Sequence, residues 1–256
     1  MRTPEEHREL VEQYLGELAL TPELHGLMEA MRYSLEGGGK RIRPVICLAV
    51  GEAAGCEPDE LLPAGAAVEL VHNFSLVHDD LPGLDDDATR RGRPSTHAQF
   101  GVGIAVLAGD ALLSEAFRLA LSYPTTAVAR ELADATLGMI GGQYLDLSGD
   151  YADGEELNKL KTGRLFDAAV GMPLWVAGIP ETEQKPWRAF GAELGQLFQV
   201  VDDILDEDGY VASHGLDGAR RIADQAATRA RAALGEIPAD TSVLADIVDG
   251  LAARTS

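Results

Sequence analysis

Apolar residues recur every three or four positions along most of the chain, the spacing that places them on one face of an α-helix. Between residues 63 and 80, for example, the apolar positions include Ala67, Leu70, Val71, Phe74 and Val77. No stretch alternates polar and apolar residues as a half-buried strand would. The pattern predicts an all-α protein of about ten helices, over residues 4–20, 22–35, 44–51, 63–80, 104–122, 125–147, 154–170, 186–206, 216–234 and 241–254.

Glycine and proline mark the breaks between these helices. Residues 37–40 interrupt the pattern before Pro44, and proline suits the first turn of the helix that follows. Pro63 is expected to open its helix in the same way. Because the chain contains no linker, low-complexity segment or strong repeat, we expect one domain over residues 1–256.

Acidic residues outnumber basic ones, since 42 Asp and Glu against 21 Lys and Arg give a net charge of −21. Such a charge argues against nucleic acid as a partner and disfavours binding to anionic lipid. An anion could bind only at a local basic cluster or through metal ions.

The apolar stretches and cysteines restrict the location of the protein. The longest apolar stretch, residues 101–109, is too short to cross a bilayer. Cys47 and Cys56 are too few for a disulfide-rich secreted scaffold, so we expect both to be reduced. The first residues are charged and show no signal sequence. We therefore expect no membrane span and a cytoplasmic location.

The first candidate site is an acidic cluster at the end of the helix predicted over residues 63–80. It contains Asp79, Asp80, Asp85, Asp86 and Asp87. Asp79 and Asp80 fall at the C-terminal end of that helix, where the helix dipole disfavours negative charge, and a broken local rule of this kind is typical of functional sites. A solvated acidic loop explains this cluster equally well.

A second acidic cluster lies on the helix predicted over residues 186–206. Gln199, Asp202, Asp203 and Asp206 follow one face of this helix, which is apolar on most other sides. Carboxylates on a buried helix need cations, because an unpaired buried charge is very costly. Oxygen ligands alone favour Mg²⁺, Mn²⁺ or Ca²⁺ over zinc, and Mg²⁺ commonly binds carboxylates together with a substrate phosphate. Two such clusters in one bundle suggest a diphosphate held between them.

Basic residues are gathered in three groups, although the chain has few of them. The groups are Lys40, Arg41 and Arg43; Arg90, Arg91 and Arg93; and Lys161 and Arg164 with Thr162 between them. Arginine and lysine side chains bind phosphate oxygens, whereas surface ion pairs are the alternative for any single group. His78, beside the first acidic cluster, is expected to pack or cap rather than to bind a ligand.

Several sequence strings follow one another between residues 38 and 206. They are GGKRIRP (38–44), VHNFSLVHDDLPGLDDD (71–87), RRGRPSTH (90–97), GVGIAVLAGDALL (101–113), GGQYLDL (141–147), KTGRLF (161–166) and GAELGQLFQVVDDILD (191–206). In this order they resemble the all-trans isoprenyl (polyprenyl) diphosphate synthases, which include bacterial farnesyl and geranylgeranyl diphosphate synthases.

The resemblance implies an isoprenoid-synthase-type helical bundle, a single all-α domain with a central cavity, in a homodimer. The implied reaction is a short-chain trans-prenyl transfer, in which isopentenyl diphosphate condenses with an allylic diphosphate by ionisation, condensation and elimination. Metal and basic groups stabilise the charge on the leaving diphosphate, and an apolar cavity excludes water from the cation. The implied metal is Mg²⁺, as three ions once diphosphate is bound, with Asp79, Asp85, Asp202 and Asp206 as ligands.

The resemblance also assigns roles to single residues. Lys40, Arg43, His72 and Arg91 match the isopentenyl diphosphate site, and Arg90, Lys161, Thr162 and Gln199 match positions that contact the allylic diphosphate. The implied catalytic groups are Asp79, Asp80, Asp85, Arg90, Lys161, Asp202 and Asp203. Phe74 and Ser75 match the positions that set chain length, where a bulky Phe74 favours a C15 product, with C20 as the next choice.

The sequence departs from the family pattern after Asp206. The family continues there with a lysine-containing loop, whereas this chain has a shortened segment at about residues 207–218 and no lysine after Lys185. Arg220 and Arg221 are the candidates to replace the missing lysine, and His214 is expected at the surface.

Two other functions share parts of this pattern. A terpene cyclase has the same fold and first acidic motif, but it usually carries an Asn, Ser and Glu motif in place of DDILD and does not need GGKRIRP. A weakly active or regulatory partner subunit of another synthase would be expected to lose the acidic clusters, which are intact here. A helical protein with solvated acidic faces leaves the ordered motifs unexplained. A prenyltransferase is therefore the function that we expect.

Overall fold

A computed structural model describes residues 1–151 and 154–255. Within these residues the expected all-α fold is confirmed, because the only strands are two short arms of one hairpin. The α-helices are α1 (Pro4–Glu17), α2 (Leu27–Leu35), α3 (Ile42–Ala53), α4 (Pro58–Asp79), α5 (Thr96–Phe100), α6 (Val102–Ala120), α7 (Ala127–Ser148), α8 (Gly154–Asn158), α9 (Arg164–Val176), α10 (Lys185–Asp206), α11 (Gly209–Gly235) and α12 (Ser242–Ala252). The short elements are the 3₁₀ turns η1 (Pro22–Leu24), η3 (Glu181–Glu183) and η4 (Ala253–Thr255), the π-helix η2 (Lys159–Gly163), and the strands β1 (Thr89–Arg90) and β2 (Arg93–Pro94).

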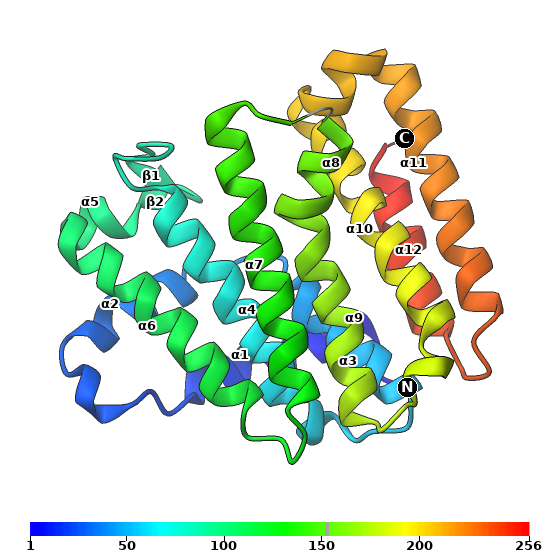
Figure 1. Cartoon of the computed structure of the whole chain (residues 1–256), viewed down its shortest axis with the longest axis horizontal. Coiled ribbons are helices and arrows are strands. Elements are labelled where there is room, and N and C mark those ends of the chain that lie inside the picture. The colour runs from blue at the N-terminus through cyan, green and yellow to red at the C-terminus, as the bar shows by residue number, and fades with distance from the viewer. Residues whose placement is uncertain (152–153, 256) are drawn as a thin grey trace.

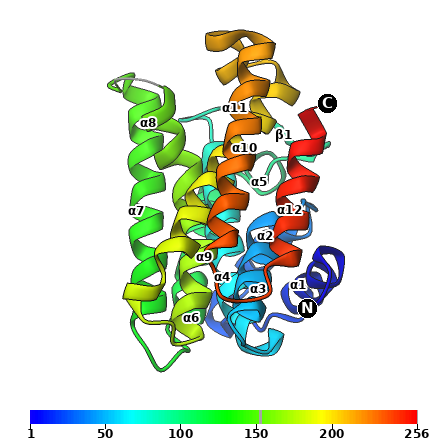
Figure 2. The same ribbon diagram turned by 90° about the vertical axis from the view of Figure 1, so that its right-hand side faces the viewer.

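The long helices pack together in one bundle (Figure 1). Helix α4 packs against α3, α6, α7 and α9, and it has buried residues along most of its length, as expected for a helix apolar nearly all round. Helices α10 and α11 pack against each other, with α12 against both (Figure 2). The ends of α4 and α10 carry the two acidic clusters, so the fold determines where these clusters lie.

The prediction that Pro63 opens a helix is wrong, because Pro63 lies inside α4. The helix begins at Pro58, where the side chain and backbone of Glu57 and Glu60 form a capping box. Proline lacks an N–H and disturbs the hydrogen bonds around it. The Tyr123 hydroxyl bridges the next pair of backbone groups, since it accepts a hydrogen bond from the Ala64 amide at 3.0 Å and donates one to the Glu60 carbonyl at 2.7 Å.

Other elements also differ from the sequence pattern: the predicted helix over residues 22–35 is divided into η1 and α2, and α5 was not predicted. The helix predicted over residues 154–170 is divided by η2, and α9 continues to Val176. Helix α11 begins at Gly209 rather than at residue 216, with a kink at Gly215 where φ is +70°. The hairpin β1–β2 was not predicted, because strands of two residues are too short to show an alternating pattern.

The remaining composition-based expectations concern the cysteines and the membrane. Cys47 is buried and Cys56 is partly buried, and both are free thiols, which confirms that no disulfide joins them. In the described part of the chain, no helix has the length and apolar character required to cross a membrane.

Candidate active site

Two adjoining cavities lie between α3, α4, α7, α9 and α10. The basic cavity, of about 550 Å³, is lined by Lys40, Arg43, Arg90, Arg91, Asp202 and Asp206, among others. The apolar cavity, of about 460 Å³, is lined by Phe74, Met139, Ile140, Tyr144, Leu147 and Leu165, with Asp79 and Lys161 also in its wall. Arg43, His72, Leu76 and Thr162 line both cavities. The site therefore joins a basic cavity to an apolar one.

The loop that carries the first acidic cluster turns back toward the C-terminal end of α4. The Asp85 amide donates a hydrogen bond to the Asp79 carbonyl at 2.9 Å, which returns the loop toward the helix. Burial raises the pKa of Asp79 to about 6, and repulsion from Asp85 and Asp80 adds to this effect against the attraction of Lys161 and Arg90. Negative charge is thus concentrated at a place that disfavours it.

Asp80, unlike Asp79, is bound to an arginine side chain, that of Arg90. The Asp80 side chain is only 4% exposed, and Oδ1 accepts hydrogen bonds from Nε of Arg90 at 2.9 Å and from Nη2 of the same side chain. Arg90 also contacts Asp87 at 3.3 Å. Hydrogen bonding to Asp80 raises the pKa of Arg90. Asp80 therefore fixes Arg90 at the edge of the basic cavity.

The second acidic cluster divides in the same way. Asp202 lines the basic cavity, and its Oδ1 lies 3.9 Å from Nζ of Lys40. Burial raises the pKa of Asp202; Lys40 opposes the shift, and Asp206 reinforces it. As in the first cluster, two carboxylates of like charge are held close to one opening.

Asp203 is buried and points to the base of α11. Its carboxylate accepts hydrogen bonds from Nε2 of Gln199 at 2.6 Å and from the Tyr210 amide at 2.8 Å. A Cβ at Gly209 would lie 2.1 Å from Oδ2 of Asp203, so glycine is needed for this approach. Burial raises the pKa of Asp203, whereas the two hydrogen bonds lower it.

Arg43 is a buried cation beneath both cavities. Its guanidinium carbon lies 4.8 Å from the ring centroid of Phe166 and 5.7 Å from that of Phe198. Within the described residues its Nε has no hydrogen-bond partner, and burial lowers its pKa to about 10. His72 lies beside it, and burial together with Arg43 and Arg91 lowers the pKa of His72 well below its usual value. His72 is therefore neutral near pH 7, while Arg43 remains charged.

Arg41 lines the basic cavity together with Lys40 and Arg43, but its guanidinium is engaged by other parts of the protein. Its guanidinium donates to Glu69 at 2.7 Å, to Glu12 at 3.0 Å and to the Leu35 carbonyl at 2.5 Å. Because Arg41 is 3% exposed and its donors are satisfied by these contacts, it stabilises the turn before α3.

Lys161 and Thr162 lie on the π-helix η2, an element that is frequent at functional sites. Nζ of Lys161 lies 2.5 Å from Oδ2 of Asp146 on α7. Asp146 was not singled out in the sequence, although it lies in the GGQYLDL string, and its partner on a separate helix is visible only in the fold. A Cβ at Gly142 would lie 2.6 Å from the Lys161 amide nitrogen, so α7 lies directly against η2.

Phe74 and Ser75 line the apolar cavity, as their expected role requires. The Phe74 ring meets the His78 ring edge to face, with centroids 4.9 Å apart. His78 lies 3.0 Å from the Val106 carbonyl of α6, and a Cβ at Gly109 would collide with it. His78 thus packs beneath Phe74, which agrees with the packing role expected for it.

The structure gathers most of the expected site residues around these two cavities. In the basic cavity are Lys40, Arg43, His72, Arg90, Arg91, Thr162, Gln199, Asp202 and Asp206. In the apolar cavity are Phe74, Ser75, Asp79 and Lys161. Three of the expected site residues, Asp80, Asp85 and Asp203, line neither of these two cavities. Arg220 and Arg221 also line neither cavity, and Arg220 donates a hydrogen bond to the Thr255 carbonyl at 3.0 Å. His214 is exposed, as expected.

The carboxylates are suited to a hard divalent cation. Among residues 1–151 and 154–255, no group of three His, Cys, Asp or Glu side chains is close enough to hold one ion by itself. The donors are oxygen atoms, and burial and mutual repulsion raise the pKa values of Asp79 and Asp202, strain that a cation would relieve. Mg²⁺ typically takes only one or two carboxylates and completes its shell with water and phosphate, so this donor set fits it.

A family model described as polyprenyl synthetase matches residues 25–228. The chain belongs to the polyprenyl synthetase family. The chain is 36% identical over 262 residues to a farnesyl diphosphate synthase of Bacillus subtilis, covering 89% of the chain and 88% of that protein. The resemblance stated from the motifs is thereby confirmed.

Solved structures of other prenyl synthases have the same fold. A geranyltranstransferase of Thermotoga maritima is 30% identical, with a TM-score of 0.88 and coverage of 98% of each chain. An FPP/GFPP synthase of Zymomonas mobilis is also 30% identical, with a TM-score of 0.86 and coverage of 97% of this chain and 98% of that one. The expected isoprenoid-synthase bundle is confirmed by these likenesses.

Proposed function

We propose that this protein is a short-chain trans-prenyltransferase that condenses isopentenyl diphosphate with an allylic diphosphate to give a C15 product, with C20 as the next choice. Family membership and relatives named as farnesyl and geranylgeranyl diphosphate synthases support this reaction class. The observation that carries the proposal is the junction of the two cavities at Arg43, His72, Leu76 and Thr162. A prenyl diphosphate needs such a junction, because its head is a dense anion and its tail is a hydrocarbon.

The basic cavity offers the cations that two diphosphates require. We assign Lys40, Arg43, His72 and Arg91 to isopentenyl diphosphate, because all four line the basic cavity and Lys and Arg side chains bind phosphate oxygens. Arg90, Lys161, Thr162 and Gln199 are assigned to the allylic diphosphate. Asp80, Asp146 and Asp203 hold Arg90, Lys161 and Gln199 respectively, so they orient these groups in the absence of substrate.

Members of this family use Mg²⁺, and the carboxylates of this chain fit it. We assign Asp79 and Asp85 to the first side of the metal site and Asp202 and Asp206 to the second, with three ions once diphosphate is bound. When bound, Mg²⁺ supplies the positive charge that lets the diphosphate leave. The raised pKa values of Asp79 and Asp202 show how strongly the protein alone disfavours these charges.

The reaction proceeds in three steps. The C–O bond of the allylic diphosphate breaks, and the bonding electron pair leaves with the diphosphate while Arg90 and Lys161 stabilise the developing negative charge. The double bond of isopentenyl diphosphate attacks the allylic cation and forms the new C–C bond. A proton is then lost from the adjacent carbon to the departing diphosphate, which restores a double bond. Phe74, Met139 and Leu165 exclude water, which would otherwise trap the cation.

The oligomeric state and location remain part of the proposal. Exposed apolar residues on α6 and α7 that line neither cavity include Val102, Ile104, Leu107 and Leu137. Such a patch supports the homodimer that the resemblance implies, since large exposed apolar surfaces mark interaction sites. A cytoplasmic location is the one in which we expect the protein to act.

Product analysis tests the proposal. The purified protein is incubated with Mg²⁺, isopentenyl diphosphate and either dimethylallyl or geranyl diphosphate, and the products are identified by chromatography and mass spectrometry. We expect chain extension to C15. Hydrocarbon formed from the allylic diphosphate alone would instead indicate a terpene cyclase. No turnover alone, with altered products when a second synthase is present, would indicate a partner subunit.

A further inference from the structure

The hairpin β1–β2 carries Arg90 and Arg91 to the basic cavity through a two-residue turn. Thr89 pairs with Pro94 and Arg90 pairs with Arg93, so Arg91 and Gly92 form the turn, with φ values of +52° and +75°. Two positive φ angles characterise the type I′ turn, which favours Asn-Gly or Gly-Gly. Arginine in this conformation is unusual and is held only where surrounding contacts impose it. The position of Arg91 therefore depends on what holds the hairpin.

The inner side of the hairpin is held through the arginine side chains themselves. Arg90 binds Asp80 and Asp87, and Nη1 of Arg91 donates to the Gly38 carbonyl. The Arg91 guanidinium also lies over Gly39, where a Cβ would come within 2.8 Å of Nη1. A substrate diphosphate would compete for these guanidinium groups, so these contacts alone do not fix the backbone when substrate binds.

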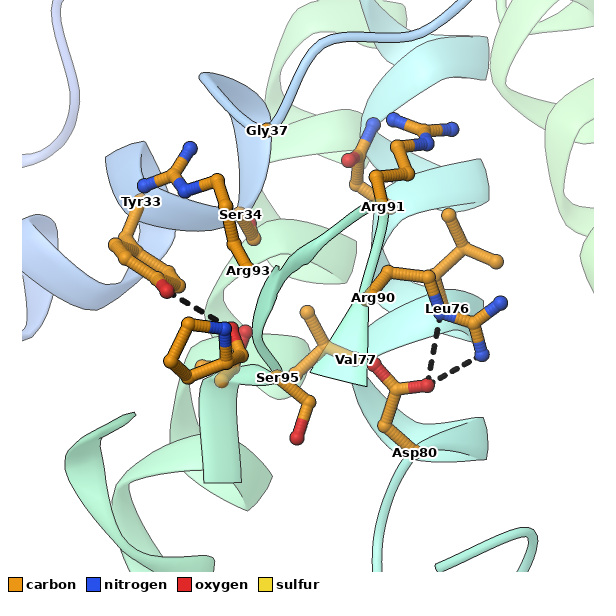
Figure 3. A pocket seen from close by; sticks show the side chains of 13 residues that line it. Tyr33, Ser34, Gly37, Leu76, Val77, Asp80, Arg90, Arg91, Arg93 and Ser95 are labelled. Carbon is orange, nitrogen blue, oxygen red and sulfur yellow. Dashed lines mark hydrogen bonds and ion pairs between the residues drawn. The ribbon is translucent and has the colours of Figure 1, made fainter. Parts of the chain in front are cut away.

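The outer strand is held by a residue that lines neither of the two described cavities. The Tyr33 hydroxyl of α2 donates a hydrogen bond to the Pro94 carbonyl at 2.8 Å (Figure 3). The Arg93 guanidinium carbon lies 4.2 Å from the centroid of the Tyr33 ring, which also meets Phe100 edge to face at 5.2 Å. Tyr33 thus contacts the hairpin at both Arg93 and Pro94, neither of which lines the basic cavity.

We propose that Tyr33 is a positioning residue, which holds the outer strand of the hairpin so that Arg91 is presented to isopentenyl diphosphate. The proposal rests on the proposed function and deepens it. Arg90 has additional anchors in Asp80 and Asp87, whereas the only recorded anchor of the Arg91 side chain among the described residues is one carbonyl of the glycine turn. Loss of the Tyr33 contact therefore affects Arg91 more than Arg90.

The test compares Tyr33→Phe with Tyr123→Phe. Each variant loses only a hydroxyl that binds backbone, but Tyr123 acts at the far end of α4, at Glu60 and Ala64. For Tyr33→Phe we expect the KM for isopentenyl diphosphate to rise about five-fold, while the KM for the allylic diphosphate changes less than about two-fold. For Tyr123→Phe we expect a lower Tm and both KM values unchanged.

A double variant distinguishes positioning of Arg91 from a general loss of stability. In an Arg91→Ala background, adding Tyr33→Phe is expected to raise the KM for isopentenyl diphosphate no further, because both changes remove one interaction. An unchanged KM in Tyr33→Phe, an equal rise in both KM values, or additive effects in the double variant would overturn the proposal.

A binding measurement separates this proposal from the proposed function. Calorimetry gives the Kd of isopentenyl diphosphate for the wild-type protein and for Tyr33→Phe without any turnover. If the wild-type protein condenses no substrates, the proposed function fails, yet weaker binding by Tyr33→Phe still supports the positioning role. An unchanged Kd overturns that role, and no binding by the wild-type protein overturns both.

Discussion

Neighbouring carboxylates of the second acidic cluster have opposite surroundings. Asp202 is half-exposed to the basic cavity and lies near Lys40, whereas Asp203 is 5% exposed and binds Gln199 and the Tyr210 amide. The first is free to bind a cation, and the second joins α10 to α11. One sequence motif therefore combines a binding group with a structural one.

Asp202→Asn and Asp203→Asn are expected to separate these roles. Asp202→Asn removes a charge that burial and Asp206 disfavour, so Tm should be equal or higher while kcat falls by about 100-fold or more. Asp203→Asn replaces one acceptor of a buried, charge-assisted pair and should cost about 1–3 kcal/mol of stability. Thermal denaturation and steady-state kinetics on both variants test this, and the reverse assignment of effects would contradict it.

Phe74→Ala is expected to lengthen the product by one five-carbon unit, from C15 to C20. The ring is 7% exposed in the wall of the apolar cavity, so its removal deepens the space for the hydrocarbon tail. Val77→Ala is the control, since Val77 is a buried residue of the same helix that lies outside the described lining of this cavity. Chromatography of the products decides: an unchanged product from Phe74→Ala, or a longer one from Val77→Ala, speaks against the assignment.

At the scale of single residues, the sequence predicts which side chains line the site better than it predicts the residues with which they pair. The spacing of Asp202 and Asp206 placed both on one helix face, and both line the basic cavity. Nothing local distinguishes Arg41 from Arg43, however, because Glu12 and Glu69, which bind Arg41, come from other helices. The same limit applies to Lys161 and Asp146.

At the scale of elements, the π-helix η2 depends on a close approach to α7. A helix of regular pitch was predicted through Lys161, whereas the structure widens the turn there and places Lys161 beside Asp146. Gly142 permits this, because its missing side chain leaves room for the Lys161 backbone. The position of Lys161, which we assign to the allylic diphosphate, thus depends on a glycine of another helix.

Gly142→Ala is expected to displace η2 and to raise the KM for the allylic diphosphate, by about ten-fold for a displacement that costs roughly one hydrogen bond to phosphate. A Cβ at Gly142 would lie 2.6 Å from the Lys161 nitrogen. Gly141→Ala is a matched control, since among the described residues nothing lies within 4 Å of its Cβ. That control should gain about 0.5–1 kcal/mol of stability, because alanine favours a helix over glycine. Kinetics and thermal denaturation of both variants test these expectations. An equal change in the KM for the allylic diphosphate in both variants would rule out a specific role of Gly142 in placing η2.

Sequence periodicity predicted the long helices but not the irregular parts. Pro63 suggested a helix start, and only the fold shows that Tyr123, from a distant loop, satisfies the backbone around it. The β1–β2 hairpin likewise depends on Tyr33 and Asp80, which precede it in the sequence. Such elements are stabilised by tertiary contacts, which a local pattern does not contain.

At the scale of the whole molecule, an acidic protein presents a basic cavity to its proposed substrates. The net charge is −21, yet Lys40, Arg43, Arg90 and Arg91 meet in one cavity. Asp79 and Asp202 lie beside these cations and carry raised pKa values. Removal of bound Mg²⁺ should therefore destabilise the folded protein in a manner that depends on pH.

Asp79 gives the sign of this dependence. Its folded pKa of about 6 lies above its usual value, so its contribution to stability is present at low pH and is lost as pH rises through about 6. Mg²⁺ binds the ionised carboxylate, and its stabilising effect grows over the same range. We expect saturating Mg²⁺ with inorganic diphosphate to raise Tm by several degrees at about pH 7.5 and by much less at about pH 5.

Scanning calorimetry with and without a chelator measures this shift, and Asp79→Asn is the control. The variant keeps the size of the side chain but cannot ionise. At about pH 7.5, Mg²⁺ should therefore raise its Tm less than that of the wild-type protein, because only Asp85, Asp202 and Asp206 remain as carboxylate ligands. A shift of equal size at both pH values, or a full shift in Asp79→Asn, would show that the ions bind elsewhere. In that case the basic cavity would have to bind diphosphate through Lys40, Arg43 and Arg91 alone.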